Sequence, residues 1–456
     1  MKICSTRRQF IKQSSLTALG IGLGLTGGCR KSNAVNKPNI FLFLSDDHGI
    51  FDTSCYGNIT AQTPHIDRLA AEGMCFYNMF TLDAMGPPSR ATLYTGLHPH
   101  RHGLYMTGGS AQNNVKSLPH YLSELGYKVV LAGKFDIQPK SVFPFTCIHI
   151  DQAQEFLQKS HNQPFCLIMA TRDPHAPYFP KSVRTGGIDP DELQLAPYIV
   201  DGPKTRQLVA AYYANVQNMD AELGDYIELI RETGLENDTM CIYTSDNGPG
   251  LPFAKWTLYD AGLNVPFVVK WPARVESATV SKALVSFADV LPTLIESAGG
   301  REPQELDGRS FLPVLNGETN VHHEFVYGAH THQGVTSGGI YPIRSVRSIR
   351  YKYIRNLQPD NLFTNKITEG CECCSGIDAD QCWAEWKKLA ETNPQVAKLV
   401  EKYQKRPAEE FYDLQNDPFE LNNLAGYTEY QKPMLELRKH LTIWIKKQND
   451  PLAHRI

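Results

Sequence analysis

The chain is predicted to be an α/β protein with a central, mostly parallel sheet flanked by helices and a smaller C-terminal α+β domain. From Lys37 to Gly317, short apolar runs alternate with longer amphipathic segments, which is typical of a parallel sheet covered by helices. Beyond Gly317, residues 342–354 partly alternate in period two, which indicates antiparallel strands. We therefore expect a first domain over 37–317 and a second over 318–456.

Individual elements are predicted from apolar runs and from residues that start or stop helices. Residues 40–44 form an unbroken apolar run, as expected for a strand buried on both faces. Thr63 and Pro64 supply an N-cap and a first-turn proline, and Gly73 supplies a stop, so a helix is predicted between them. The same criteria predict strands over 128–132, 165–170, 240–244 and 266–270, and helices over 206–234 and 431–448.

Residues 1–36 are predicted to be an export signal rather than part of the fold. The segment Thr6-Arg7-Arg8-Gln9-Phe10-Ile11-Lys12 resembles a twin-arginine signal, and the apolar stretch after it is too short to span a bilayer. Residues 25–29 end in Cys29 and resemble a lipoprotein processing site. We expect an exported protein, periplasmic or lipid-anchored in the bacterial envelope, whose membrane contact would be a lipid on Cys29.

Charge and cysteine usage narrow the classes of partner and site. A net charge of −3 provides no basic surface for binding nucleic acid. Four of the 11 cysteines are clustered: Cys371, Cys373, Cys374 and Cys382. In an exported protein such a cluster is more typical of disulfides than of zinc, and its spacing does not fit a zinc ribbon. The sequence leaves the disulfide pairing and the oligomeric state open.

Polar side chains follow at least four of the predicted strands, at the point where each strand ends. The sequences are Ser45-Asp46-Asp47, Gly133-Lys134, Asp173-Pro174-His175 and Ser245-Asp246-Asn247-Gly248. In an open parallel sheet the ligand site lies beyond the carboxyl ends of the strands, so these side chains are expected to meet. Acidic and amide oxygens beside a lysine and a histidine suit a hard cation with a bound anion.

The oxygen-bearing residues among them predict a class of metal. Asp46, Asp47, Asp246 and Asn247 match the preference of Ca²⁺ or Mg²⁺ rather than that of zinc or copper. Such a cation would polarise an oxygen of an anionic ester. The alternative is that each acidic pair merely caps the helix after its strand. Two such pairs at strand ends in one domain favour the metal.

A short motif relates this region to a known family. Gly86-Pro87-Pro88-Ser89-Arg90, followed by Ala91-Thr92-Leu93-Tyr94-Thr95-Gly96, resembles the sulfatase signature C/S-x-P-S-R. Residues 245–259, which include Lys255, residues 327–346 and residues 411–425 keep the spacing of the heparan N-sulfatases. From Asn39 to its C-terminus the chain therefore resembles a sulfatase of the alkaline-phosphatase superfamily, and it is most similar to that group.

The resemblance implies an alkaline-phosphatase-like fold and hydrolysis of a sulfate ester or N-sulfate on a sugar or glycosaminoglycan fragment. It implies that the four oxygen-bearing residues bind Ca²⁺, with Mg²⁺ as the alternative. Arg90 would hold the reacting residue, Lys134 and Lys255 would neutralise sulfate oxygens, and His175 would protonate the leaving group. Fixed cations and a histidine suit a transition state that gathers charge on sulfuryl oxygens. Two residues of the second domain would contact the sugar: His332 and Arg344.

The sequence departs from the family pattern at two positions of the reacting centre. The first residue of the signature is a Cys or Ser that is oxidised to formylglycine, and Gly86 lacks the Cβ that this requires. The family usually has G-K-x-H where this chain has Gly133-Lys134-Phe135-Asp136, so Asp136 replaces a histidine. Both departures lie where the sulfate would react, whereas the expected metal ligands are all present.

Three explanations are compatible with these departures. The protein could be a catalytically inactive relative that still binds a metal and a sulfated glycan, which the retained Lys134 and Lys255 favour. A water on the metal could attack instead, with Asp136 as its base, in a phosphodiesterase or phosphonate hydrolase. A neighbouring group, Asp83 or Ser89, could replace the nucleophile, although Ser89 is better explained as a hydrogen-bonding residue at a helix start.

A polar loop adds a cluster of histidines at His98-Pro99-His100-Arg101-His102-Gly103. A transition-metal cluster is one interpretation of His98, His100 and His102. A loop at the rim of the substrate pocket, as the resemblance implies, is the favoured one. The exact sugar and linkage are not encoded in any motif that we recognise.

Overall fold

A computed structural model describes residues 37–159, 162–179, 187–370 and 379–455 of the chain. Residues 37–456 form one compact unit. The predicted export signal with Cys29, and three cysteines of the predicted disulfide cluster, lie outside the described residues. Across the described part of the chain, no helix combines the length and the apolar character needed to cross a membrane.

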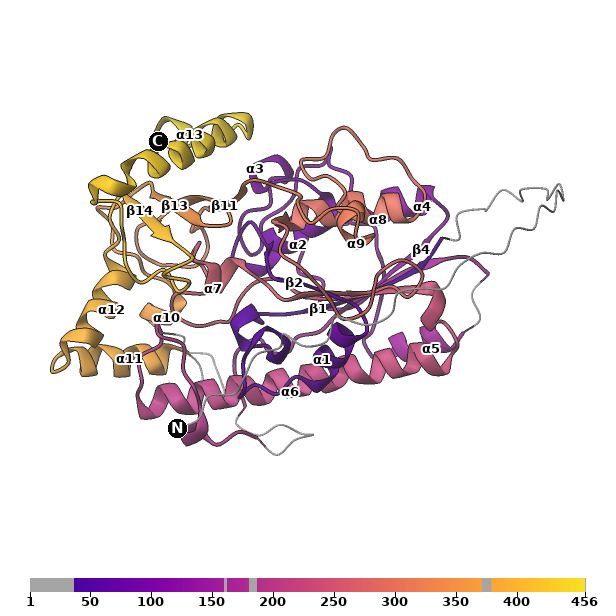
Figure 1. Cartoon of the computed structure of the whole chain (residues 1–456), viewed down its shortest axis with the longest axis horizontal. Coiled ribbons are helices and arrows are strands. Elements are labelled where there is room, and N and C mark those ends of the chain that lie inside the picture. The colour runs from indigo at the N-terminus through magenta and orange to yellow at the C-terminus, as the bar shows by residue number, and fades with distance from the viewer. Residues whose placement is uncertain (1–36, 160–161, 180–186, 371–378, 456) are drawn as a thin grey trace, which may run out of the picture. The chain divides into compact units, whose positions relative to one another are not determined.

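An eight-stranded sheet forms the centre of this unit, in the order β5-β4-β6-β1-β7-β8-β2-β9 (Figure 1). Its first five strands are mutually parallel: β5 (Thr146–Ile148), β4 (Lys128–Gly133), β6 (Phe165–Ala170), β1 (Asn39–Ser45) and β7 (Thr239–Ser245). Beyond β7, β8 (Phe267–Lys270) runs antiparallel to both neighbours, and β2 (Met74–Phe76) pairs in parallel with β9 (Thr279–Ser281). The predicted mostly parallel sheet and its five predicted strands are confirmed.

Helices cover both faces of the sheet (Figure 1). One face carries α1 (Pro64–Ala71), α5 (Gln152–Gln158) and α6 (Pro203–Glu232). The other carries α2 (Gly86–Thr95), α4 (Leu118–Glu124), α8 (Val290–Ser297) and α9 (Leu312–Leu315). Alternate residues of β1 enter the two cores, Phe41 and Phe43 on the α6 side and Leu42 on the α2 side. The unbroken apolar run of β1 follows from this burial on both faces.

A second sheet follows in the C-terminal part of the unit. Its four antiparallel strands are β11 (Val326–His330), β12 (Ile343–Arg347), β13 (Tyr351–Asn356) and β14 (Glu409–Asp413). The last helix, α13 (Gln431–Lys447), packs Met434, Leu437 and Leu441 against this sheet. The predicted antiparallel strands and terminal helix are therefore confirmed.

Short elements connect the two sheets. Strands β3 (Met79–Phe80) and β10 (Val285–Ser286) form a separate parallel pair. The remaining α-helices are α3 (Pro99–His102), α7 (Asp260–Leu263), α10 (Lys366–Glu369), α11 (Ala379–Ala390) and α12 (Pro394–Gln404). Helix α11 packs on both α12 and α6, so C-terminal residues reach the first sheet's helix layer.

Candidate active site

The ends of β1 and β7 place four predicted residues in one buried cluster. Asp46 and Asp47 follow β1, and Asp246 and Asn247 follow β7, all of them almost completely buried. The backbone N–H of Asp47 donates to Oδ1 of Asp246 at 3.0 Å, and Nδ2 of Asn247 donates to Oδ1 of Asp47 at 2.7 Å. Asp47 has a φ of 69°, a left-handed conformation that Asp tolerates better than most residues.

This cluster fits a hard divalent cation. Oδ1 of Asn247 is buried and has no hydrogen-bond partner among the described residues. A buried carbonyl oxygen of this kind costs free energy unless it is satisfied, and a cation ligated by oxygen atoms would satisfy it. Ligand atoms of Asp46, Asp47 and His175 also lie within 4.8 Å of one another. The donor set is therefore dominated by the oxygen atoms that such ions prefer.

Arg90 is directed at the same cluster by its position on α2. It lies one helical turn after Gly86, and its Nε donates to Oδ2 of Asp246 at 2.9 Å. Its Nη2 stands 3.6 Å from Oδ1 of Asp46. Burial lowers the pKa of Arg90, but Asp246 and Asp46 outweigh burial and raise it overall. Among the described residues, Nη1 and Nη2 have no hydrogen-bond partner, but Arg90 is completely buried and does not line the cavity described below.

Two lysines complete the charge of the cluster. Lys134, just after β4, pairs with Asp46, and Lys255 pairs with Asp47. Burial lowers the pKa of Lys134, but the neighbouring Asp46 reverses this and raises it above its usual value. Together with Arg90, the two lysines balance the three carboxylates of the cluster, so a bound divalent cation would leave it with a net positive charge.

His175 faces the cluster from the segment after β6. Its Nδ1 lies 2.5 Å from the carbonyl oxygen of Ala176, which assigns the Nδ1 proton to that hydrogen bond. Its Nε2 lies 3.7 Å from Oδ2 of Asp47, and 39% of the side chain is exposed. Nε2 is thus the nitrogen that can take up and release a proton beside a bound ligand.

Gly86 begins α2 with its Cα turned toward the cluster. A Cβ added to Gly86 would lie 2.9 Å from Oδ2 of Asp246 and 4.0 Å from Nε of Arg90. A side chain at this position would therefore enter the cation site, as the resemblance implies. Pro87 and Pro88 have no backbone N–H, and that of Ser89 donates to the carbonyl oxygen of Met85, so the start of α2 adds few donors for an anion.

The two groups considered as replacement nucleophiles are engaged elsewhere. Ser89 donates to the carbonyl oxygen of Asp246 and accepts from Oγ1 of Thr81 at 2.6 Å. Asp83 is fully buried, with its Oδ1 2.8 Å from Nδ1 of His330. Ser89 therefore acts as the hydrogen-bonding residue near the start of α2, and neither residue lines the cavity described next.

A cavity of about 650 Å³ opens over the cluster. Asp136, whose side chain is 44% exposed, lines it with Oδ2 3.2 Å from Nζ of Lys134. The predicted residues in its wall are Asp46, Asp47, Gly86, Lys134, Asp136, His175 and Lys255. Asp173, named among the strand-end residues, also lines the cavity, and five further charged or aromatic residues of the wall were not predicted: Arg172, Phe179, Trp256, Lys366 and Asp380.

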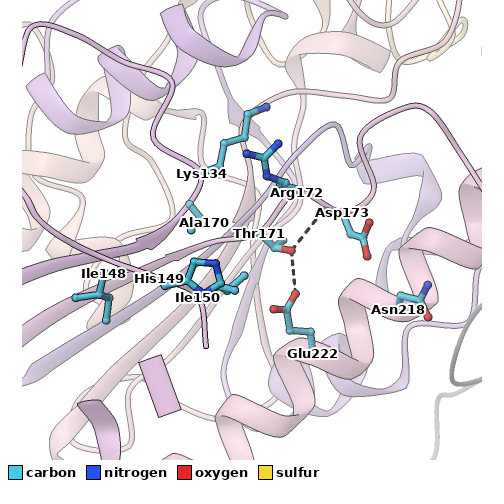
Figure 2. A pocket seen from close by; sticks show the side chains of 11 residues that line it. Lys134, Ile148, His149, Ile150, Ala170, Thr171, Arg172, Asp173, Asn218 and Glu222 are labelled. Carbon is cyan, nitrogen blue, oxygen red and sulfur yellow. Dashed lines mark hydrogen bonds between the residues drawn. The ribbon is translucent and has the colours of Figure 1, made fainter. Parts of the chain in front are cut away.

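A second cavity, of about 550 Å³, adjoins the first (Figure 2). Lys134, Arg172 and Asp173 line both cavities. Burial raises the pKa of Asp173 to about 6, and the nearby Asp46 adds to this shift. Thr171 follows the last residue of β6 and donates to Oε2 of Glu222 at 2.8 Å (Figure 2). Asp173 was expected here from its strand-end position, and the same sequence signal could have found Arg172, which directly precedes it.

His332 and Arg344 do not lie in either cavity, which corrects the expectation that they contact the sugar. Both are completely buried. Nδ1 of His332 accepts from the backbone N–H of Tyr341 at 2.9 Å. Arg344 donates through Nε and Nη2 to the two carboxylate oxygens of Asp450, at 2.5 and 3.0 Å. Arg344 and Nδ1 of His332 therefore interact within the C-terminal part of the protein, whereas Nε2 of His332 is buried without a hydrogen-bond partner among the described residues.

The histidine loop likewise lies away from the cavity over the cation cluster. Nδ1 of His98 accepts from Nε1 of Trp444 at 3.0 Å, and Nε2 of His100 lies 3.0 Å from Asp450. His102 is buried with Nε2 3.1 Å from Oγ1 of Thr92. Each histidine has a different partner, so this loop joins α2 to the C-terminal segment and does not form the rim of that cavity.

Comparison with known proteins assigns the family. The sulfatase family profile matches residues 38–149 and 142–300, which is more than half of the chain. The chain belongs to the sulfatase family. The profile described as N-sulphoglucosamine sulphohydrolase, C-terminal, also matches residues 250–364. Members of this family use a divalent metal, in agreement with the oxygen-rich cluster at the ends of β1 and β7.

Individual sulfatases are similar to this chain over most of its length. An ulvan-active sulfatase of Formosa agariphila is 33% identical over 452 residues, covering 93% of this chain and 84% of that protein. Human N-sulphoglucosamine sulphohydrolase is 28% identical, covering 95% of this chain and 93% of that protein. A solved structure in complex with its substrate D-glucosamine-2-N,6-O-disulfate matches with a TM-score of 0.69 and 20% identity, covering 91% of this chain and 98% of that one. The last likeness establishes the fold.

Proposed function

We propose that this sulfatase-family chain hydrolyses a sulfate ester or N-sulfate group of a sugar, with Ca²⁺ as its cation. The observation that carries the proposal is the buried cluster in which three carboxylates and Asn247 meet Arg90, Lys134 and Lys255 beneath a cavity. The likeness to N-sulphoglucosamine sulphohydrolase supports a glycosaminoglycan fragment as substrate. Four protein oxygen ligands suit Ca²⁺ better than Mg²⁺, which usually keeps several waters.

Charge balance explains how such a site would select an anion. Without an ion the three carboxylates are neutralised by the three basic side chains. A bound divalent cation makes the cluster positive and would polarise an oxygen of the sulfate. Lys134 and Lys255, which line the cavity, would then hold the other sulfate oxygens, and the buried Arg90 would add its positive charge beside Asp246 and Asp46.

The remaining side chains define a route for the protons. Gly86 supplies no attacking atom, so the attacking oxygen would be that of a water in the space beside its Cα. As the water oxygen bonds to sulfur, the bond from sulfur to the sugar oxygen or nitrogen breaks. The leaving atom would take a proton from Nε2 of His175, and the water proton would pass to Asp136, a carboxylate that lines the same cavity.

Gly86 also supports a second candidate function, capture of a sulfated glycan without turnover. Removal of a nucleophile in other hydrolases lowers the rate by roughly a million-fold. The cation ligands and both lysines would still bind the sulfate group. This candidate shares the ligand and the site with the first and differs only in the chemical step.

The test combines sulfate release with ligand binding. The purified protein with Ca²⁺ is incubated with N-sulfoglucosamine or an aryl sulfate, and free sulfate is measured by ion chromatography. We expect slow release that is lost in Lys255→Ala. Calorimetric binding without sulfate release would establish the capture function instead. If the protein shows no binding of the ligand and no release of sulfate, both candidate functions are contradicted.

The N-terminal sequence supports a proposal on location. We infer that the chain is exported through its twin-arginine motif and carries a lipid on Cys29. Fractionation of cells that express the full chain, with mass spectrometry of the mature N-terminus, tests both points. The expected result is a lipid-modified Cys29 in the membrane fraction, released to the soluble periplasm by Cys29→Ala. An unprocessed chain in the cytoplasm would contradict the proposal.

A further inference from the structure

A second cluster of metal-ligand side chains lies outside the active site. Asp289 ends the short 3₁₀ helix that precedes α8, and His322 and His323 lie just before β11. Ligand atoms of the three side chains lie within 4.8 Å of one another. The cluster therefore joins the helix layer of the first sheet to the segment that leads into the second sheet.

The distances within this cluster approach those of a zinc site. Oδ2 of Asp289 lies 3.5 Å from Nε2 of His322 and 2.9 Å from Nε2 of His323. Tetrahedral zinc with bonds of roughly 2.0–2.1 Å places neighbouring ligand atoms about 3.3 Å apart. The two carboxylate–imidazole distances therefore lie within about half an ångström of the separation that zinc requires, and all three ligand atoms lie within 4.8 Å of one another.

An unpartnered nitrogen points to a ligand at this position. His322 is nine-tenths buried, and its Nε2 has no hydrogen-bond partner among the described residues although it faces the Asp289 carboxylate. A buried ring nitrogen in this state is unfavourable unless a ligand occupies the space before it. The side chain of His323 is 23% exposed, which leaves an approach from solvent and a position for water.

The carboxylate is already oriented by groups outside the cluster. The backbone N–H of Ser286 donates to Oδ2 of Asp289 at 2.8 Å, and that of Arg309 donates to Oδ1 at 2.9 Å. Such outer hydrogen bonds orient a ligating carboxylate and increase the affinity of the site. The ring of His322 is also held in place, because it packs edge-on against Phe311 at 6.1 Å and against His323 at 4.3 Å.

We propose that Asp289, His322 and His323 form a structural zinc site with water as its fourth ligand. Two imidazole nitrogens and a carboxylate suit zinc and disfavour Ca²⁺, so this site and the oxygen-rich active site would take different ions. Zinc would replace the direct contact between Nε2 of His323 and the Asp289 carboxylate, and would tie residues 322–323 to the start of α8. An ion that binds the folded state alone raises its stability.

The decisive comparison is between the wild-type chain and His322→Phe. Phenylalanine keeps an aromatic ring against Phe311 and removes the ligand nitrogen, together with its contact to the Asp289 carboxylate at 3.5 Å. His454→Ala, at an exposed position, is the matched control. Each protein is stripped with a chelator, dialysed against ZnCl₂ in the presence of Ca²⁺, and analysed for bound zinc and thermal midpoint.

We expect the wild type and His454→Ala to retain one zinc more per chain than His322→Phe, with a zinc-dependent rise in Tm that this variant lacks. Without zinc the wild type and His454→Ala should unfold at similar temperatures, and His322→Phe at a lower one because it loses the contact to Asp289, so the zinc-dependent shift of each protein is the readout. If His322→Phe does not fold, His323→Gln takes its place, because its side chain is partly exposed. Equal zinc content and equal Tm shifts in the wild type and the variant would overturn the proposal. No sulfated ligand is involved, so the result is independent of the proposed hydrolysis.

Discussion

A Cβ on Gly86 would lie 2.9 Å from Oδ2 of Asp246, the oxygen that also accepts from Nε of Arg90. Position 86 therefore points into the cation site, and the Asp246 carboxylate would have to shift to admit a Cβ there. In a sulfatase this is the direction from which an attacking side chain would reach the bound sulfate. The chain thus keeps Asp246 and Arg90, the residues that would surround such a side chain, whereas the side chain itself is absent.

Restoring the side chain should restore fast chemistry. Gly86→Cys, co-expressed with a formylglycine-generating enzyme, should release sulfate up to roughly a million-fold faster than the wild type, the scale on which a nucleophile contributes in other hydrolases. Gly86→Ala, which adds the Cβ without an attacking atom, is the matched control and should show no gain. Mass spectrometry confirms the conversion of the cysteine, and a converted variant without a gain would contradict the prediction.

Lys255 should affect the two ligands of the site in opposite directions. Because Lys255 neutralises Asp47, Lys255→Met should raise the affinity for Ca²⁺. The same change removes a charged donor to the sulfate and should weaken binding of N-sulfoglucosamine by about 10- to 100-fold. Titration calorimetry measures both affinities, with Lys140→Met at an exposed position as the control. A fall in both affinities would mean that Lys255 only supports the fold.

Removal of the cation should destabilise the protein. A chelator should lower Tm, and Ca²⁺ at about 100 times its Kd should restore about 2.7 kcal/mol of unfolding free energy. Asn247→Ala removes the buried oxygen that lacks a partner and should reduce this response. Differential scanning calorimetry measures the shift. A Tm that is unaffected by the chelator and by Ca²⁺ would show that the cluster is satisfied by its own ion pairs.

The parallel sheet and its polar edge could be predicted because both follow from local sequence. The apolar residues of β1 are buried on both faces of the sheet, and Asp46 is the first residue after this strand. Chain direction alone then places Asp46 beside Asp246 at the end of the adjacent strand. By contrast, β2 and β9 are too short to give a periodic pattern, so the antiparallel extension of the sheet was not predicted.

Side chains that depend on distant contacts could not be placed from the sequence. The partner of Arg344 is Asp450, 106 residues further along the chain, and this pairing buries a residue expected at the pocket. Lys366 and Asp380 reach the active-site cavity from α10 and α11, which carry no motif. Their positions depend on how the C-terminal part packs, which local patterns do not encode.

Asp52 should make stability depend on pH in the weakly acidic range. Burial raises the pKa of Asp52 to about 6, opposed by hydrogen bonds from Tyr213 and Tyr212. A raised pKa means that the folded state binds the proton more tightly. The stability that the protonated Asp52 contributes is therefore fully present below the unfolded pKa of 3.8, and it is lost as pH rises through the folded pKa of about 6.

Asp52→Asn should remove this dependence. An asparagine can accept from one tyrosine hydroxyl and donate to the other, so it preserves both contacts without a charge. Relative to the wild type, the variant should gain up to about 3 kcal/mol between pH 4 and pH 7. Urea unfolding of both proteins at the two pH values measures the difference. If the unfolding free energies of the two proteins change with pH in the same way, ionisation of Asp52 does not destabilise the folded state.

Arg344 should control stability and leave ligand binding unchanged. Its guanidinium is completely buried and makes two hydrogen bonds to Asp450. Arg344→Ala should cost about 3–5 kcal/mol, because it leaves the Asp450 carboxylate buried without its main partner. The affinity of the folded variant for N-sulfoglucosamine should equal that of the wild type. A loss of affinity at unchanged Tm would instead restore Arg344 as a sugar contact.

A double variant separates the ion pair from simple packing. Replacing both charges in Arg344→Met/Asp450→Leu leaves no unpaired charge in the interior, so it should be less destabilising than Arg344→Ala alone. His100, whose Nε2 lies 3.0 Å from Asp450, limits the recovery because it loses the same carboxylate. A double variant as unstable as the single one would mean that the Arg344 side chain contributes through its packing, with the charge of Asp450 making little difference.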